Sequence, residues 1–213
     1  MPSVKRSIAS IVSTCRALAA EGFVVATDGN VSVRLASWDI LVTGTRVTKR
    51  TITGAGVVRL SPDGNRRSGS VAPSSEARLH LFIYSKRKDV HAIVHAHPPY
   101  CTAFAVARKP LAVAAIPEVV VEFGTIPLVP FAVPSTGKLS KAIAPFVSRC
   151  DFFLLANHGV VACGRDIAEA FEKIERAEHA AKIILLSRLL GGERKLAPGE
   201  LRELRTIARR RKR

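Results

Sequence analysis

The sequence predicts an α/β fold built on one hydrophobic core, and three observations support that prediction. The chain has 213 residues, of which 47% are hydrophobic, so it can bury one good core and is most simply a single domain. Short apolar runs bounded by turn residues alternate with segments of helical periodicity. The chain holds neither a Gly-x-Gly-x-x-Gly motif nor a P-loop, so the alternation does not indicate a nucleotide-binding fold.

A helix followed by a hairpin is expected near the N-terminus. Residues 4–20 place apolar side chains on one face, and Gly22 ends the helix. The sequence Asp28-Gly29-Asn30 is typical of a turn before a strand at 31–35, and residues 39–42 are the expected hairpin partner of that strand.

The following stretch predicts a strand, a helix and a second, buried strand. Residues 57–60 form the first strand. A helix begins near Pro73-Ser74-Ser75-Glu76 and runs to about Lys86, because serine after proline and then glutamate is typical of a helix start. Residues 90–97 form the buried strand, which ends at Pro98-Pro99 before a short helix.

The second half of the chain predicts more strands and then a long helix. We expect strands at 118–123 and 127–131 and a helix near 136–148. A hairpin over 151–163 follows, and apolar residues at helical spacing then predict a helix from about 166 to 190.

The charge of the chain is strongly basic, with 33 basic against 17 acidic residues and a formal net charge of +16. Much of the excess lies in residues 196–213, a predicted basic tail in which Pro198 opens a last helix that dissolves into solvated arginines. Such a tail would bind nucleic acid only non-specifically, through phosphates. A positive field would also attract anionic sugar phosphates. No apolar run reaches the length of a membrane span, the N-terminus lacks a secretory core and the four cysteines are scattered, so we expect a cytoplasmic protein.

Three histidines are the strongest functional signal. His95 and His97 are two apart on a predicted strand, so their side chains share one face. His158 follows another apolar run and precedes Gly159. Most isolated His-x-His pairs bind no metal, but three neutral imidazoles suit zinc with an open fourth position. The concentration of histidines therefore predicts a catalytic divalent metal.

Ser74, Ser75 and Glu76 begin the helix that precedes the histidine strand. The positive end of a helix attracts an anion, and the two hydroxyls could donate to a phosphate. Glu76, in the first turn, would face whatever occupies the same cleft. Taken alone, this local pattern favours an ordinary capped helix in which Glu76 interacts with the helix dipole.

Together these motifs resemble the class II aldolase/adducin family. Asp28-Gly29-Asn30-Val31-Ser32, Pro73-Ser74-Ser75-Glu76, His95-Ala96-His97 and Asn157-His158-Gly159 occur in the order and spacing of that family, and the resemblance covers about residues 5–190. It implies a three-layer α/β/α sandwich with a central, mainly antiparallel sheet, formed by a domain over residues 1–195. It also implies a homotetramer with active sites at subunit interfaces.

The resemblance implies a role for each matching residue. His95, His97 and His158 match zinc ligands, although another divalent metal could take the site. Glu76 matches a catalytic acid/base that can also touch the metal. The matches to the substrate-phosphate pocket are Asn30, Ser74 and Ser75, with Thr43, Gly44, Thr45 and Arg46 in its remaining part.

Two departures from the family pattern leave the reaction open. Arg46 stands where the phosphate loop usually has glycine, and it could serve a phosphate or a carboxylate, or lie solvated in the loop. Glu118 falls near the place of a tyrosine that in fuculose-phosphate aldolase acts from a neighbouring subunit. A glutamate there resembles the dehydratase branch, and we assign it a catalytic role.

We expect a zinc-dependent aldolase that splits a phosphorylated ketose, such as fuculose 1-phosphate, into dihydroxyacetone phosphate and an aldehyde. The alternatives are a metal-dependent dehydratase, epimerase or decarboxylase of a related sugar phosphate or sugar acid, because all of these begin with a metal-chelated carbonyl. A non-catalytic adducin-like module is a further alternative, against which the presence of three histidines together with Glu76 argues.

Overall fold

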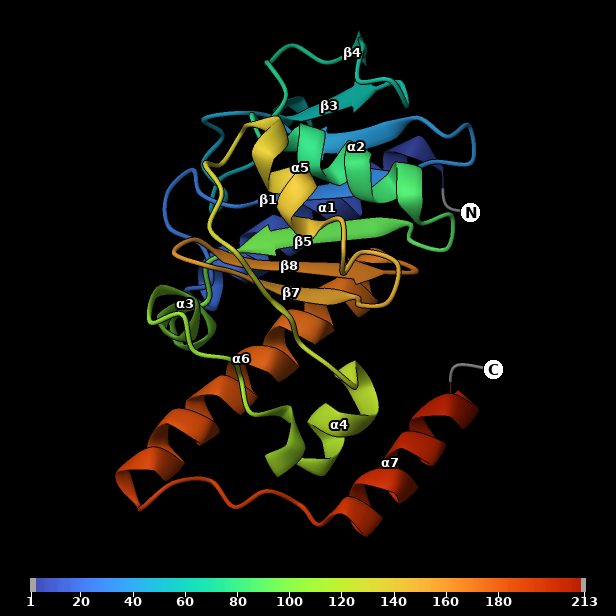
Figure 1. The fold of residues 1–213 in the computed structure, drawn as a ribbon. Helices are drawn as coiled ribbons and strands as arrows, with labels where there is room; N and C mark the ends of the chain where they lie inside the picture. The colour runs from blue at the N-terminus through green and yellow to red at the C-terminus, as the bar shows by residue number, and fades with distance from the viewer. Residues whose placement is uncertain (1–2, 212–213) are drawn as a thin grey trace.

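Alternate residues of the central strands face opposite sides of one sheet, and helices cover each side. The computed structural model describes residues 3–211 and shows a single sheet between two helical layers (Figure 1). The strands are β1 (Asn30–Arg34), β2 (Ile40–Thr43), β3 (Val57–Leu60), β4 (Arg66–Ser68), β5 (Ala92–Ala96), β6 (Leu128–Val129), β7 (Phe152–Leu155) and β8 (Gly159–Gly164). The helices are α1 (Val4–Ala20), α2 (Ala77–Lys86), α3 (Pro99–Val106), α4 (Pro117–Phe123), α5 (Gly137–Ile143), α6 (Ile167–Leu189) and α7 (Pro198–Arg211), with short 3-10 turns η1 (Gly54–Gly56) and η2 (Val113–Ala115).

The eight strands are ordered β4-β3-β2-β1-β5-β8-β7-β6. Every described pairing is antiparallel except that of β6 with β7, which is parallel. The central strand β5 pairs with β1 on one side and with β8 on the other, so that His95 lies opposite Asn30 and Val161. The predicted sandwich with a mainly antiparallel sheet is confirmed.

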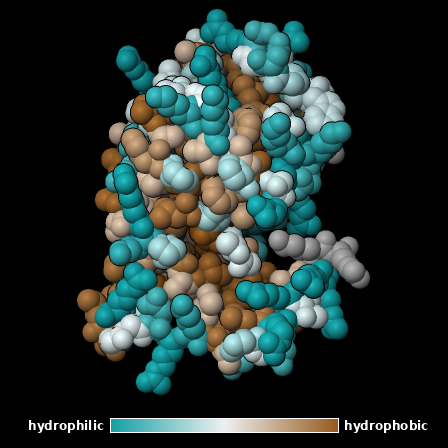
Figure 2. Space-filling view, in the orientation of Figure 1, coloured by the Kyte–Doolittle hydropathy of each residue, from teal (hydrophilic) through white to brown (hydrophobic). Residues whose placement is uncertain are grey.

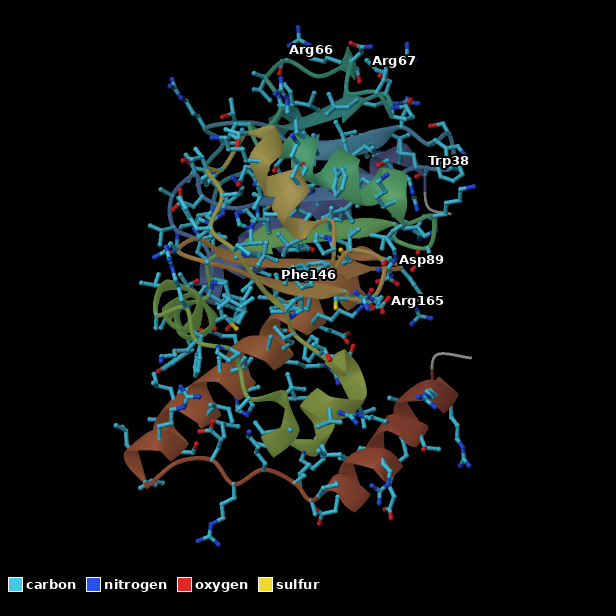
Figure 3. All side chains as sticks on the ribbon, in the orientation of Figure 1. Trp38, Arg66, Arg67, Asp89, Phe146 and Arg165 are labelled. Carbon is cyan, nitrogen blue, oxygen red and sulfur yellow. The ribbon has the colours of Figure 1, made fainter. Side chains whose placement is uncertain are left out.

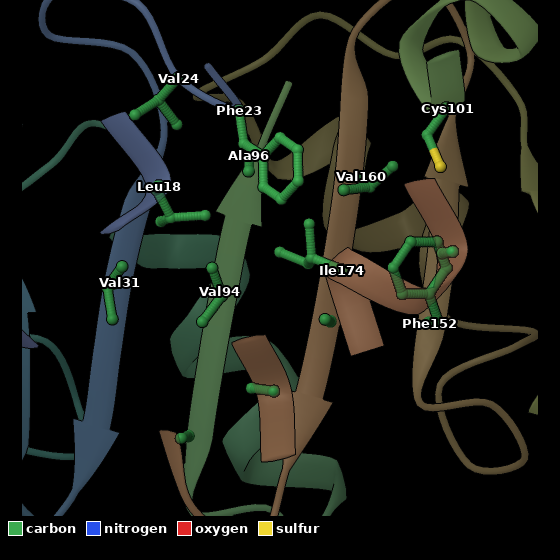
Figure 4. Close-up of a cluster of buried hydrophobic side chains, with 14 of the residues drawn as sticks. Leu18, Phe23, Val24, Val31, Val94, Ala96, Cys101, Phe152, Val160 and Ile174 are labelled. Carbon is green, nitrogen blue, oxygen red and sulfur yellow. The ribbon is translucent and has the colours of Figure 1, made fainter. Parts of the chain in front are cut away.

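The pleat of β5 divides the core into two clusters. Val94 faces the helices α1 and α6 and packs with Leu18 and Ile174, as Figure 4 shows. Ile93 faces α2 and α5 and packs in the second cluster, which also contains Ile83. His95 is two residues after Ile93 on the same strand, so its side chain also lies on the α2 side of the sheet.

The predicted strand at 118–123 is wrong, because this segment is the helix α4. Pro117 occupies the first turn, Glu118 is an acidic residue in that turn, and Gly124 follows the helix with a φ of 62°. Proline at a helix start and glycine past its end outweigh the strand preference of the three intervening valines.

Other boundaries differ less. The second predicted strand of that region shrinks to β6, and α5 ends at Ile143 before a series of turns. The predicted tail is helical up to Arg211, and Lys212 and Arg213 lie outside the described residues. Glu200 accepts a hydrogen bond from the Ala197 backbone N–H (2.6 Å) and so stabilises the start of α7. Between residues 3 and 211, no helix has the length and apolar character needed to cross a membrane.

Candidate metal centre

The sheet brings the three predicted histidines together at one end of its central strands. His95 is the penultimate residue of β5 and is 1% exposed, and His97 follows directly after the strand. The turn between β7 and β8 supplies His158. That turn is fixed to α3, because the Asn157 N–H donates to the Ala105 carbonyl (3.1 Å).

Two glycines allow the histidine segment to pack closely against neighbouring backbone. A Cβ on Gly29, whose φ is 70°, would lie 2.7 Å from the His95 carbonyl oxygen. A Cβ on Gly159 would lie 2.5 Å from both the Ala96 carbonyl oxygen and the His97 ring. Both distances are shorter than any side chain tolerates, so glycine is required on either side of the segment.

The imidazoles point at one another. The Nε2 atoms of His95 and His97 are 3.2 Å apart, and the ring centroids of the three histidines are 4.6–5.1 Å apart. His95 Nδ1 lies 2.8 Å from the Val160 carbonyl oxygen, to which it donates, so its Nε2 is the nitrogen that faces the cluster. One potential ligand atom from each ring lies within 4.8 Å of the others.

Glu76 completes the cluster from the start of α2. Its Oε2 lies 3.1 Å from His95 Nε2, and its Oε1 lies 3.5 Å from His158 Nε2. Asn30 Nδ2 donates to Oε2 at 2.9 Å. The carboxylate is thereby aimed at the point where the rings converge.

Burial and mutual proximity set the protonation of the site. Burial, followed by the neighbouring histidines, lowers the pKa of His97 to about 3 and that of His158, beside His95, to about 4. For Glu76, burial acts to raise the pKa, but His95, His158 and the Asn30 hydrogen bond outweigh it and the pKa is lowered. For His95, burial acts to lower the pKa, but Glu76 outweighs it and the pKa is raised. Two imidazoles are therefore neutral at pH 7, as metal ligands must be.

The residues present fit a divalent metal. Two zinc–nitrogen bonds of about 2.0–2.1 Å at a tetrahedral angle separate the nitrogens by roughly 3.3 Å, close to the spacing of His95 and His97. Glu76 Oε1, a buried atom that faces the rings, makes no hydrogen bond within the described residues. Convergent lone pairs with unmet partners are what a bound cation would satisfy.

The segments predicted to surround the substrate phosphate lie side by side. Gly44 and Pro73 form an isolated bridge, and the Ser74 N–H donates to the Thr43 carbonyl (3.1 Å). Thr43 itself is buried, and its hydroxyl accepts from the Val31 N–H (3.3 Å). Its side chain therefore anchors the start of the loop at residues 44–46 to β1. Thr45, which follows Gly44, is exposed.

Two further members of this set have marked local geometry. Arg46 is exposed and has a φ of 56°, so it keeps the left-handed conformation that favours glycine. Ser75 is exposed and its hydroxyl accepts from the Ser135 hydroxyl (2.8 Å), whereas Ser74 accepts from the Glu76 N–H (3.3 Å). The structure thus brings the predicted loop residues to the neighbourhood of Glu76.

Glu118 lies elsewhere. It sits in the first turn of α4 and lines a cavity of about 310 Å³ together with Arg176 and His179 of α6. Within residues 3–211 it has no recorded contact with the histidine cluster. Its catalytic role stays a prediction, and it requires a neighbouring subunit.

Two supporting residues were missed by sequence reasoning. Asp28 Oδ2 lies 3.8 Å from His97 Nδ1, and its place in the Asp-Gly-Asn turn could have indicated it. Lys49 is 1% exposed, and its ammonium group donates to the carbonyls of Thr27 and Val47 (both 2.9 Å). It ties the Asp-Gly-Asn turn to the loop that holds Arg46. Nothing in its basic flanks signals this burial.

Three comparisons with known proteins agree on the family that this chain resembles. Residues 9–185 match the model of the "Class II Aldolase and Adducin N-terminal domain". The chain is 32% identical over 195 residues to the 3-oxo-tetronate 4-phosphate decarboxylase of Escherichia coli K12, covering 87% of this chain and 88% of that protein. It is 32% identical over 177 residues to the L-fuculose phosphate aldolase of Escherichia coli O6:H1, covering 82% and 80%. Among solved structures, an L-fuculose 1-phosphate aldolase superposes with a TM-score of 0.89 at 28% identity, covering 100% of this chain and 99% of that one.

Proposed function

The chain belongs to the class II aldolase and adducin family, and on that premise we propose that it is a divalent-metal-dependent lyase. Its substrate would be a phosphorylated sugar or sugar acid, and the bond broken would be a carbon–carbon bond next to a carbonyl group. The observation that carries the proposal is the convergence of three imidazoles and Glu76, with the carboxylate oxygens 3.1 Å and 3.5 Å from two histidine nitrogens.

His95, His97 and His158 would hold the metal, and three imidazole ligands with an open position favour zinc. When bound, the cation would supply Lewis-acid stabilisation of the negative charge that develops on the substrate oxygens as the bond breaks. Glu76, a carboxylate in the free site, would take up a proton from the substrate or from water and pass it to the carbon that loses its substituent. Asn30, which donates to Glu76 at 2.9 Å, would hold that carboxylate in place.

The phosphate of the substrate would bind at the adjoining loops. The hydroxyls of Ser74, Ser75 and Thr45 could donate to a phosphate, and the Arg46 guanidinium could pair with it or with a substrate carboxylate. Fixing the phosphate sets the distance of the reacting carbon from Glu76, which is how remote binding energy contributes to catalysis.

Within this class, we favour decarboxylation of a 3-oxo sugar acid phosphate. Aldol cleavage must remove a proton from an alcohol, whereas decarboxylation only has to release carbon dioxide and protonate a carbon. Neither tyrosine is an obvious donor for the proton transfer of aldol cleavage. Tyr84 is buried with its hydroxyl 2.8 Å from Ser32 Oγ, and the Tyr100 ring packs against the core below Lys182. Arg46 supplies a cation that a carboxylate substrate could use.

Aldol cleavage is the second candidate, and the close superposition on an L-fuculose 1-phosphate aldolase supports it. It would need an acid/base in place of the tyrosine. Glu118 of a neighbouring subunit in a homotetramer is the group we assign to it.

One assay separates the two reactions. The zinc-loaded protein is given 3-oxo-tetronate 4-phosphate and, separately, fuculose 1-phosphate. Both reactions yield dihydroxyacetone phosphate, so carbon dioxide and lactaldehyde are the products to measure. Carbon dioxide that disappears on chelation and in Glu76→Gln supports decarboxylation, and lactaldehyde supports aldol cleavage. A protein that binds no metal, or that binds it and cleaves neither substrate, would contradict the proposal.

A further inference from the structure

The predicted basic tail does not simply extend into solvent, because α7 forms one wall of a cavity. This cavity has a volume of about 680 Å³ and lies between α7, α4 and the segments that precede β6 and β7. Figure 1 shows α7 alongside α4 at the edge of the molecule, and Figure 2 shows apolar surface between the hydrophilic side chains of α7 and the sheet. The volume lies within the range of about 300–1,000 Å³ that is typical of small-molecule sites.

Three arginines line this cavity, two from α7 and one from the turns after α5. Arg205 and Arg209 are four residues apart on α7 and so share one helix face. Arg149 comes from the turns after α5, where its Nη2 donates to the Pro145 carbonyl (3.2 Å). No carboxylate lines the cavity among the described residues, and none is recorded in an ion pair with these three side chains. All three residues are exposed, and a bound anion would supply the counter-charge that the cavity lining lacks.

The rest of the wall is apolar. Its apolar lining residues include Phe123, Phe146, Leu128, Val120 and Pro127. A guanidinium binds phosphate through two parallel hydrogen bonds, and three of them match the charge of a phosphomonoester better than that of one carboxylate. The apolar wall would hold a flat or apolar body attached to that phosphate.

The cavity is separate from the histidine cluster. Cys150, which lines the cavity, precedes β7, and His158 follows it. A four-residue strand spans about 13 Å, and none of the cavity-lining residues belongs to the histidine cluster or to the loops near Glu76. A ligand here would not be the substrate of the lyase.

We propose that this arginine cavity, lined by Arg149, Arg205 and Arg209, binds a small organic phosphate with a planar apolar group, of which a nucleotide is the simplest example. The proposal does not depend on the reaction catalysed at the histidine cluster. It assigns α7 the role of one wall of a binding site.

The test is direct binding to the full-length protein. A fluorescent adenine nucleotide is titrated at about 0.15 M salt, where weak surface electrostatics are largely screened. We expect Arg205→Gln/Arg209→Gln and Arg149→Gln each to weaken binding about tenfold or more, since charge-assisted hydrogen bonds are lost. The matched control is Arg202→Gln/Arg210→Gln, which removes the same charge from α7 outside the cavity lining and should change affinity less than about twofold.

Competition identifies the part of the ligand that is recognised. Unlabelled adenosine monophosphate should displace the probe better than inorganic phosphate or adenosine alone. Circular dichroism of each variant checks that α7 still forms. No binding at about 1 mM probe, or equal losses in the cavity variants and the control, would overturn the proposal. Tighter binding of single-stranded RNA with equal contributions from the four substituted α7 arginines would also overturn it, in favour of a non-specific nucleic-acid surface.

Discussion

The sheet carries a polar cluster at each end of its central strands, and the two clusters differ in how their atoms are satisfied. The histidine cluster, made of His95, His97, His158, Glu76 and Asn30, lies where β5 and β7 end. The ion-pair cluster, made of Arg87, Asp89, Asp151, Arg165, Glu169 and Lys173, lies where β5 and β7 begin, and Figure 3 labels Asp89 and Arg165 at that edge.

In the ion-pair cluster the charges are matched. Arg87 Nη2 lies 2.6 Å from Asp89 and 2.7 Å from Asp151. Arg87 Nη1 donates to the carbonyls of Val147 and Cys150. Lys173 donates to Glu169 (3.0 Å) and to the Cys163 carbonyl (2.8 Å). No atom of this cluster appears among the described buried polar atoms that lack a hydrogen bond.

In the histidine cluster, by contrast, three buried atoms have no hydrogen-bond partner within the described residues: Asn30 Oδ1, Glu76 Oε1 and His158 Nδ1. Unsatisfied buried groups cost stability unless something else binds them. Both clusters are polar and partly buried, so composition alone does not separate them. An unmatched carboxylate oxygen facing three imidazoles marks the histidine cluster as the candidate site, and matched charges mark the ion-pair cluster as a structural support.

The sharpest test of this contrast is His95→Ala. It removes a proposed metal ligand and the partner of Glu76, so bound metal should be lost and turnover should fall about a thousandfold or more, because a catalytic cation supplies several kcal/mol. Metal content per chain is the measurement. His91→Ala, on the same segment at the other end of β5, is the control and should retain its metal; equal metal content in both variants would show that the ligand assignment is wrong.

The second prediction separates metal binding from proton transfer. Glu76→Gln removes the charge but keeps the hydrogen-bonding shape, so the metal and the thermal midpoint should persist while turnover falls about a hundred- to ten-thousand-fold. Steady-state kinetics of the metal-loaded protein measure the loss. Undiminished turnover would move the acid/base role to Glu118.

The third prediction concerns the opposite end of the sheet. Arg87→Ala removes the donor to Asp151 Oδ1 and to two backbone carbonyls, and the side chain is only 14% exposed. The free energy of unfolding should fall by about 3 kcal/mol. Urea unfolding measures this, and turnover per folded molecule should stay unchanged. A loss of activity without a loss of stability would refute the division of roles between the two clusters.

The smallest effect is expected at the rim of the same cluster. Arg165 is 84% exposed and pairs with Glu169 at 3.0 Å. Solvent screens such a pair, so Arg165→Ala should cost less than about 1 kcal/mol of unfolding free energy. If Arg165→Ala lowered the unfolding free energy as much as Arg87→Ala, the exposed fraction of a side chain would not predict how much its ion pairs stabilise this protein.

Local sequence patterns predicted which histidines share one face of the sheet and where the hairpin that carries His158 lies. The pairing of His95 with His97 follows from strand parity, and the position of His158 follows from a hairpin with clear apolar strands. The helix α4 could not be recognised in this way, because three consecutive valines favour a strand until the flanking Pro117 and Gly124 are given more weight. The same limit applies to contacts between distant segments. Arg87 meets Asp151 across 64 positions, and Lys49 is buried by two loops whose approach no local pattern contains.

The pair of glycines beside the histidine segment has a consequence for altering this protein. Gly29 and Gly159 bring neighbouring backbone against residues 95–97 at distances that exclude any Cβ. The positions of the three histidine rings therefore depend on how closely the main chain packs at these two glycines. Substitutions of other side chains would not change that backbone packing. Directed evolution toward a new substrate should therefore tolerate substitutions in the exposed loop around Thr45 and Arg46. Substitution of either glycine should instead displace the histidine segment and abolish activity on every substrate.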